Sequence, residues 1–156
     1  AERMYIASKN GGAFMIERGT QKPIRTSNRV SLEIGTNIYI DDYFEIVKTT
    51  FSNKLQAFLP SSRGFSIGSS AIYYADVASG AADLALECTR KGNLEIAVAY
   101  GLEIEAGAAI VDLQGTALAS KKYLEFGQKE QLPVITAATE ELAKKLIEHL
   151  KAQPTQ

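Results

Sequence analysis

Residues that could bind an anion or a hydroxyl-rich ligand occur together at Gly68-Ser69-Ser70. They stand at the start of a run of small residues that predicts a helix over about 68–79, and the first backbone N–H groups of a helix have no partner within it. These groups and the helix dipole favour negatively charged or hydroxyl-rich ligands. From local chemistry alone, the alternative is that Ser66 or Ser69 only caps the helix.

Two carboxylates lie at the ends of neighbouring predicted elements. Glu87 closes a short apolar stretch that begins at Ala82 and reads as a buried strand, and Glu95 is the second residue of a helix predicted to begin near Leu94. A carboxylate at a strand end is often simply solvated. A glutamate in the first turn of a helix is favoured by the dipole, by a few tenths to about 1 kcal/mol. Both residues therefore have a structural explanation as well as a chemical one.

Other chemical arrangements find less support in the sequence. The acidic pair Asp41-Asp42 precedes an apolar face at helical spacing, and Glu45 follows three residues after Asp42, which favours a capping box over a metal site. The only histidine, His149, lies near the end of the last predicted helix. A Ser/His/Asp or Cys/His triad therefore cannot be assembled from this sequence.

The elements that must position the candidate residues alternate along the chain. A helix over about 68–79, a strand over 82–87, a second helix from Leu94 and a strand beginning at 110 follow one another. Such alternation, with alanines and glycines where elements touch, is typical of an α/β layer. The sequence therefore predicts an α/β fold with closely packed helices.

Further elements are predicted outside this stretch. Asn10-Gly11-Gly12 separates two short apolar runs and predicts a β-hairpin, because these residues accept positive φ. The alternation in Val30–Ile34 predicts a strand. Two more strands are predicted at Tyr123–Phe126 and Pro133–Ile135. A last helix is predicted after Thr139, which caps it, and lysines follow in its later turns.

The composition excludes several classes of protein. The 17 basic and 18 acidic residues give a net charge of -1, and no basic stripe with interleaved aromatics indicates nucleic acid as a partner. No apolar run approaches the length of a membrane span. A single cysteine, Cys88, excludes an internal disulfide and makes a cytoplasmic location the default expectation. We expect a single α/β domain over 1–152, followed by a tail at 153–156.

The order of the motifs resembles the inositol monophosphatase superfamily, which includes archaeal fructose-1,6-bisphosphatases and 3′,5′-bisphosphate nucleotidases. The chain carries Gly-Ser-x-Ala at 68–71, Ala-x-Gly-x-x-Asp-x-x-x-Glu at 78–87, a helix that begins with a carboxylate, Glu-Ala-Gly at 105–107 and then Val111-Asp112. The similarity extends over nearly the whole chain but only over the C-terminal half of the family. It implies layered helices and a mixed sheet like the C-terminal portion of the sugar phosphatase fold.

The resemblance also implies roles for individual residues. Gly68, Ser69 and Ser70 match a turn that touches the substrate, and Glu87 matches a glutamate that hydrogen-bonds substrate hydroxyls. Leu94-Glu95 stands where the family has Trp-Asp, whose aspartate is a magnesium ligand. Glutamate is also a hard oxygen ligand suited to Mg²⁺. Its side chain is one methylene longer, which would shift the metal, and catalytic positioning tolerates such shifts poorly.

The family's other metal ligands are missing from this sequence. An Asp-Pro-x-Asp-Gly-Thr loop, which together with an upstream glutamate supplies most of the Mg²⁺ ligands, does not occur. We therefore expect the substrate-facing part of a Mg²⁺-dependent phosphomonoesterase that acts on inositol phosphate or sugar (bis)phosphate and is incomplete without an upstream metal-binding segment. The alternative is a non-catalytic binding or assembly module with a degenerate metal site. We expect a phosphorylated small molecule as ligand, a homodimer, and no turnover by this chain alone.

Overall fold

The computed structural model describes residues 2–40, 63–65, 70–88, 94–119 and 133–152. In these ranges the chain forms, in order, β1 (Arg3–Ser8), β2 (Gly12–Glu17), β3 (Thr20–Ile24), β4 (Asn37–Ile40), β5 (Arg63–Phe65), α3 (Ser70–Ala78), β6 (Leu84–Cys88), α4 (Leu94–Ala106), β7 (Ala109–Val111), β8 (Pro133–Ala137) and α5 (Glu140–Ala152). The helix predicted after Asp42, the strand predicted at Tyr123–Phe126 and the tail lie outside the described residues.

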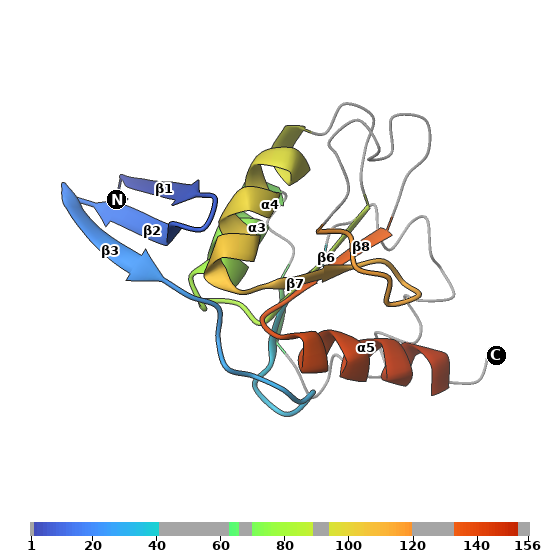
Figure 1. Ribbon diagram of the computed structural model, residues 1–156. Coiled ribbons are helices and arrows are strands. Elements are labelled where there is room, and N and C mark those ends of the chain that lie inside the picture. The colour runs from blue at the N-terminus through green and yellow to red at the C-terminus, as the bar shows by residue number, and fades with distance from the viewer. Residues whose placement is uncertain (1, 41–62, 66–69, 89–93, 120–132, 153–156) are drawn as a thin grey trace.

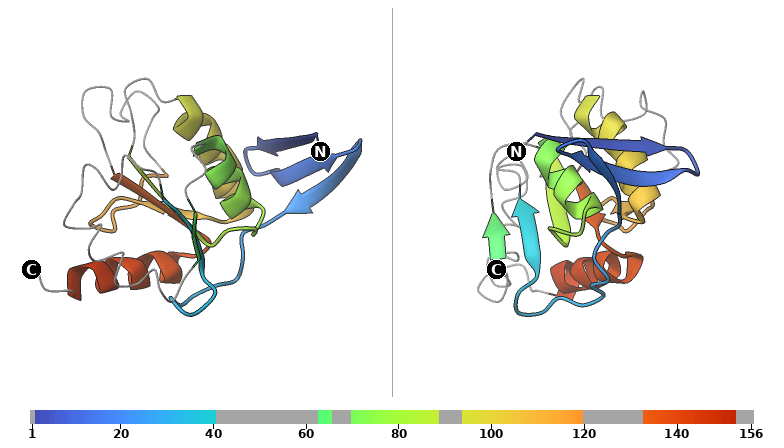
Figure 2. Two further views of the ribbon diagram at one scale, coloured as in Figure 1. Left: turned by 180° about the vertical axis from the view of Figure 1, so that it is seen from behind. Right: turned by 90° about the vertical axis from the view of Figure 1, so that its left-hand side faces the viewer.

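These elements stack in layers, as Figure 1 and Figure 2 show. A three-stranded antiparallel sheet, β1-β2-β3, packs against α4, and α3 packs against α4. The two helices cover one face of a five-stranded sheet, and α5 covers the other face. The predicted α/β fold with layered helices and a mixed sheet is confirmed.

The five-stranded sheet has the order β5-β4-β6-β8-β7. Strand β4 runs parallel to β5 and β6, whereas β8 runs antiparallel to both β6 and β7. The segments β5–α3–β6 and β6–α4–β7 are therefore crossovers between parallel strands, the connection for which a helix is the usual solution. As a result, α3 and α4 both begin at the edge of the sheet where β5 and β6 end.

Alternation along β6 distributes its side chains between two cores. Leu84 and Leu86 are fully buried in a cluster with Leu142 and Leu146 of α5, while Ala85 packs with residues of α3 on the opposite face. Helix α5 is amphipathic as predicted. Its cap is also confirmed, because the Thr139 hydroxyl accepts the N–H of Leu142 at 3.1 Å.

The predicted hairpin at Asn10-Gly11-Gly12 is confirmed as β1-β2, with φ of 61° at Asn10 and 82° at Gly12. Its turn is held to α4 by Glu105. The two carboxylate oxygens of Glu105 accept the backbone N–H of Asn10 at 2.7 Å and of Gly12 at 2.9 Å. One side chain therefore attaches the three-stranded sheet to the helix layer.

The strand predicted at Val30–Ile34 is wrong. Residues 25–36 form no strand, and Ile34 is 87% exposed. The backbone N–H of Thr36 donates to the carbonyl of Glu33 at 3.1 Å, and Gly35 has a φ of 90°. This turn ends any extended stretch before the chain enters the sheet, and the strand is instead β4. The turn outweighed the short alternation at 30–34, and Gly35 is the local signal that the alternation does not report.

Candidate functional site

Two helix N-termini lie at one edge of the five-stranded sheet. Helix α3 begins at Ser70 after β5, and α4 begins at Leu94 after β6. Figure 2 shows the two helices side by side. Ligands of open α/β sheets bind outside the carboxyl ends of the strands, and the unpaired N–H groups of a helix start favour anions. We therefore take this edge as the candidate site.

The structure places the predicted site residues as follows. Ser70 is the first residue of α3 and Glu95 is the second residue of α4, so their backbone lies at the candidate edge. Gly68 and Ser69 lie outside the described residues. The first turn of α3 has no acidic residue, so its dipole is not already compensated from within that turn. The ligand roles of these residues stay predictions.

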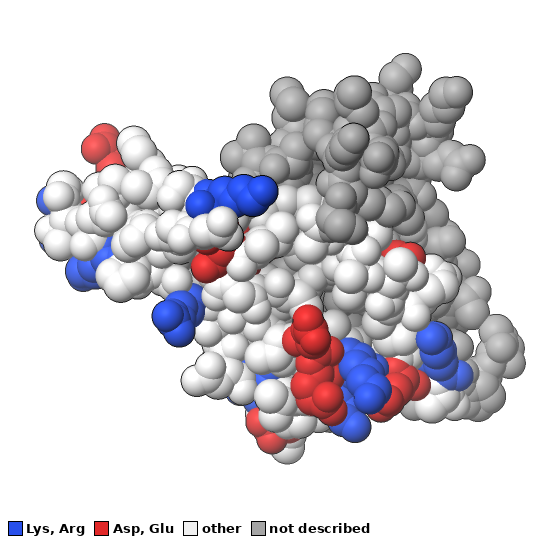
Figure 3. Space-filling view, in the orientation of Figure 1, with Lys and Arg blue, Asp and Glu red and all other residues white. Residues whose placement is uncertain are grey.

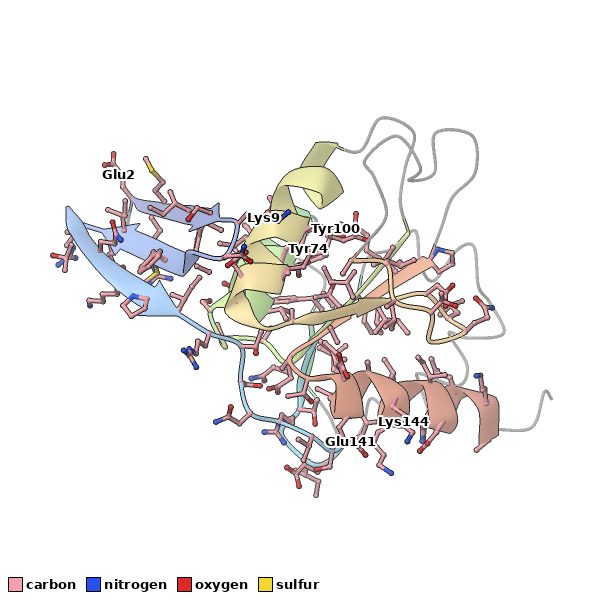
Figure 4. All side chains as sticks on the ribbon, viewed as in Figure 1. Glu2, Lys9, Tyr74, Tyr100, Glu141 and Lys144 are labelled. Carbon is pink, nitrogen blue, oxygen red and sulfur yellow. The ribbon has the colours of Figure 1, made fainter. Side chains whose placement is uncertain are left out.

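Glu87 lies near the end of β6 and is only 1% exposed. Its Oε2 accepts a hydrogen bond from the hydroxyl of Tyr74, which comes from α3. In Figure 4, Tyr74 lies between the helix layer and the sheet. The strand-end carboxylate therefore has a partner inside the protein. Its predicted contact with substrate hydroxyls stays a prediction.

Glu87 belongs to a set of buried polar side chains between the helices and the sheet, which we call the buried polar cluster. Each member of the cluster is at most 6% exposed. The members are Tyr74, Glu87, Tyr100, Glu103 and Thr136. Sequence reasoning missed this set. The signal was present, because Glu103 follows Ala99 and Tyr100 at helical spacing and so shares their buried face.

The electrostatics of the buried polar cluster follow from burial and from like charge. Burial raises the pKa of Glu103 well above its ordinary value, the charge of Glu87 raises it further, and the nearby hydroxyl of Thr136 opposes this shift. Burial and the neighbouring carboxylates of Glu87 and Glu103 likewise raise the pKa of the Tyr74 phenol. These surroundings favour the protonated, uncharged forms of both groups.

Asp83, the residue before β6, is a buried carboxylate with different surroundings. Its Oδ1 accepts the hydroxyl of Ser27 at 2.6 Å, and its Oδ2 accepts the backbone N–H of Asn37 at 2.9 Å. The guanidinium Nε of Arg29 lies 3.0 Å from the same Oδ2. Asp83 therefore holds the irregular segment before β4 against the sheet.

Two other carboxylates near the sheet are also engaged within the protein. Asp76 accepts the hydroxyl of Tyr39 at 2.8 Å, and burial together with this contact raises the pKa of Tyr39 to about 12. Asp112 accepts the backbone N–H groups of Gln114 and Thr116, both at 2.8 Å. In both cases the oxygens stabilise local structure.

The described carboxylates do not by themselves fit a metal centre. Over the described ranges, no three His, Cys, Asp or Glu side chains lie where they could hold one ion together. Asp76, Asp83 and Asp112 already accept hydrogen bonds from the protein, and Mg²⁺ requires several oxygen ligands in octahedral geometry. A magnesium site would need ligands beyond this set.

The surface shown in Figure 3 carries both signs of charge. Along α5, Lys145 lies 3.8 Å from Glu141 and 3.5 Å from Glu148. Acidic and basic side chains thus alternate on this helix, and the described part of this face has no extended basic patch. In the described part of the chain, no helix has the length and apolar character to span a membrane.

Comparison with known proteins gives two findings. The sequence model described as "Inositol monophosphatase family" matches residues 1–155. Among curated proteins nothing matches.

Solved structures resemble the fold. An inositol monophosphatase from Zymomonas mobilis has a TM-score of 0.70 at 16% identity, with 96% of this chain and 53% of that chain covered. Mycobacterium tuberculosis SuhB has a TM-score of 0.69 at 20% identity, with 96% and 54% covered. An inositol monophosphatase from Anabaena (Nostoc) has a TM-score of 0.66 at 18% identity, with 92% and 57% covered. The chain thus spans about half the length of these relatives.

Proposed function

Since the chain belongs to the inositol monophosphatase family, we propose that it is the substrate-facing part of a Mg²⁺-dependent phosphomonoesterase acting on inositol phosphate or a sugar (bis)phosphate. The observation that carries this proposal is the common edge of α3 and α4, because the two helix starts offer unpaired N–H groups beside the ends of β5 and β6. A phosphorylated small molecule suits such an edge.

Within this proposal, Gly68, Ser69 and Ser70 contact the substrate at the start of α3, and Glu87 accepts hydrogen bonds from its hydroxyl groups. Glu95, in the first turn of α4, is proposed as a ligand of Mg²⁺. The metal would neutralise charge on the phosphate and activate water. The chain's own contribution is to bind and orient the ester.

We further propose that an upstream segment supplies the remaining metal ligands. Two facts support this. The chain spans about half the length of its solved relatives, and the buried Asp83 is already committed to Ser27, Asn37 and Arg29. A phosphorylated substrate, a homodimer and a cytoplasmic location complete the proposal.

The test is Mg²⁺-dependent release of phosphate from inositol 1-phosphate and from fructose 1,6-bisphosphate. We expect no turnover by the 156-residue chain alone. Robust release by this chain would contradict the requirement for an upstream segment. If the coding sequence upstream of Ala1 contains an in-frame Asp-Pro-x-Asp-Gly-Thr loop, the longer protein is expected to release phosphate.

In that longer protein, Glu95→Gln should abolish turnover, because an amide oxygen is a much weaker ligand for Mg²⁺ than a carboxylate. Glu141→Gln, an exposed change on α5, is the matched control and should leave turnover unchanged. Full activity of the Glu95→Gln protein would assign this residue to the helix dipole alone.

A second candidate function is favoured by one observation. Glu87 is 1% exposed and bonded to Tyr74, so its carboxylate is already satisfied within the chain. A non-catalytic binding or assembly module with a degenerate metal site is consistent with this burial. Binding of inositol 1-phosphate to the longer protein without any turnover, measured by calorimetry, would favour this candidate.

A further inference from the structure

Glu103 is a fully buried acidic residue without a compensating cation in the part of the chain that the structure describes. It lies in the last turn of α4 and is 0% exposed, and neither of its carboxylate oxygens has a hydrogen-bond partner by geometry among the described residues. An isolated ionised carboxylate inside a protein costs so much free energy that the group takes up a proton instead. Its position in a helix explains the lack of partners, because the backbone N–H groups around it are already used by the helix.

The groups that face Glu103 come from each element packed around it. Helix α3 contributes Tyr74, α4 itself contributes Tyr100, β6 contributes Glu87, and β8 contributes Thr136. None of these side chains is a cation. Thr136 Oγ1 is buried without a partner among the described residues, so rotation of its hydroxyl would give Glu103 a donor.

The other elements that pack against α4 add no compensating charge. Strand β7 consists of Ala109, Ile110 and Val111, which do not titrate. On the three-stranded sheet, Arg3 of β1 pairs with Glu17 of β2 at 2.8 Å near the surface. Tyr5 packs in the separate cluster that holds the hairpin against α4. Within the described ranges, Glu87 is therefore the charge that acts on Glu103.

We propose that Glu87 and Glu103 form a buried acid pair that holds one proton at neutral pH, and that loss of this proton weakens the attachment of α4 to the five-stranded sheet. The pair is a pH-sensitive element of the fold. It rests on burial and on the arrangement of these side chains, and it does not depend on phosphatase activity.

The two members of the pair have different surroundings. Glu87 accepts the hydroxyl of Tyr74, and a hydrogen bond donated to a carboxylate favours its charged form. Glu103 has only the nearby hydroxyl of Thr136, whose effect burial and the charge of Glu87 outweigh. The proton therefore resides mainly on Glu103, although the titration of two such close groups belongs to the pair as a whole.

The direction of the pH effect follows from linkage. Burial raises the pKa of Glu103 above its value in the unfolded chain, so the folded state binds this proton more tightly than the unfolded state. The stabilisation is complete below the unfolded pKa and is lost as pH rises through the folded pKa. Over that window the unfolding equilibrium constant should rise about tenfold per pH unit, against a background set by all other groups.

The experiment is urea unfolding of the 156-residue chain from about pH 5 to about pH 9, with Glu103→Gln as the test variant. Glutamine resembles the protonated carboxyl in shape but does not titrate. In the wild type, the unfolding equilibrium constant should rise with pH by about tenfold per pH unit more than in the variant. We therefore expect the variant to become the more stable protein as pH rises. The control is Glu141→Gln on the exposed face of α5, which should keep the wild-type slope.

Equal pH slopes for the wild type and Glu103→Gln would overturn the proposal. A second measurement does not depend on how the variant folds. Infrared spectroscopy of the folded wild type should show the carbonyl stretch of a protonated carboxyl group at neutral pH, and this band should disappear on unfolding in urea. A folded protein without this band at neutral pH would also overturn the proposal.

Discussion

Asp83 and Glu103 are both buried acidic residues, yet their surroundings are opposite. Asp83 is 5% exposed and accepts hydrogen bonds from Ser27 and from the backbone of Asn37, with Arg29 beside it. Glu103 is 0% exposed and has no hydrogen-bond partner among the described residues. Hydrogen-bond donors and a cation surround Asp83, whereas Glu103 has an acidic neighbour, Glu87.

The difference lies in the backbone around each residue. Asp83 lies directly before strand β6 and beside an irregular segment, where backbone N–H groups are unpaired and can turn toward a carboxylate. Glu103 lies in a helix, where the backbone N–H groups bond within the helix, so only side chains can donate hydrogen bonds to its carboxyl group. A buried acidic residue in a helix therefore depends on which side chains its neighbours bring.

The largest expected loss of stability follows from a substitution of Asp83, the acidic residue that has partners. Asp83→Ala should lower the free energy of unfolding by about 4 kcal/mol, because the segment before β4 loses its anchor and Arg29 keeps only the more exposed Glu33 as an ion-pair partner. Urea unfolding measures this change. A loss as small as that of an exposed control such as Glu141→Gln would show that Asp83 and Glu103 are less different than their contacts indicate.

Glu105 sharpens the comparison, because it lies on the same helix as Glu103 but accepts two backbone N–H groups. Glu105→Ala should cost about 3 kcal/mol, since two hydrogen bonds to a charged group are lost. Amide hydrogen exchange at Asn10 and Gly12 should accelerate strongly, while exchange in α5 changes only with global stability. Unchanged protection of the hairpin turn would contradict its attachment by Glu105.

Tyr74→Phe tests the hydrogen bond that α3 donates to Glu87 in the buried polar cluster. Removal of the hydroxyl takes a hydrogen bond from Glu87 and should cost about 2 kcal/mol in urea unfolding. Tyr73→Phe on the same helix, whose ring stacks on Tyr39, provides a comparison that keeps the bond from Tyr74 to Glu87. An equal loss in both variants would indicate that packing, rather than the bond to Glu87, dominates.

The smallest effect is expected at the cap of α5. The Thr139 hydroxyl donates to the carbonyl of Arg29 at 2.7 Å and accepts the N–H of Leu142, so it links α5 to the segment that Asp83 holds. Thr139→Ala should cost about 1 kcal/mol, and Thr139→Ser, which keeps the hydroxyl, should cost less. Equal losses in both variants would show that the methyl group matters more than the cap.

Elements whose local signals agree could be predicted from the sequence. Helix α5 has a capping residue, acidic residues in its first turn and a single apolar face, and the hairpin has residues that accept positive φ at its turn. The strand at Val30–Ile34 was mispredicted because a five-residue alternation is a weak signal, and a turn at Glu33–Thr36 removed it.

The features of the candidate site also fall into those that the sequence predicted and those that it did not. The sequence by itself determined the family, the order of helices and strands, and the places of Ser70, Glu87 and Glu95 within them. Only the tertiary structure decided that Glu87 is buried against Tyr74 and that Glu103 shares its surroundings. The protonation of a carboxyl group depends on the dielectric and the charges within a few ångströms, and these come from α3, α4, β6 and β8 together. No local stretch of sequence contains that information.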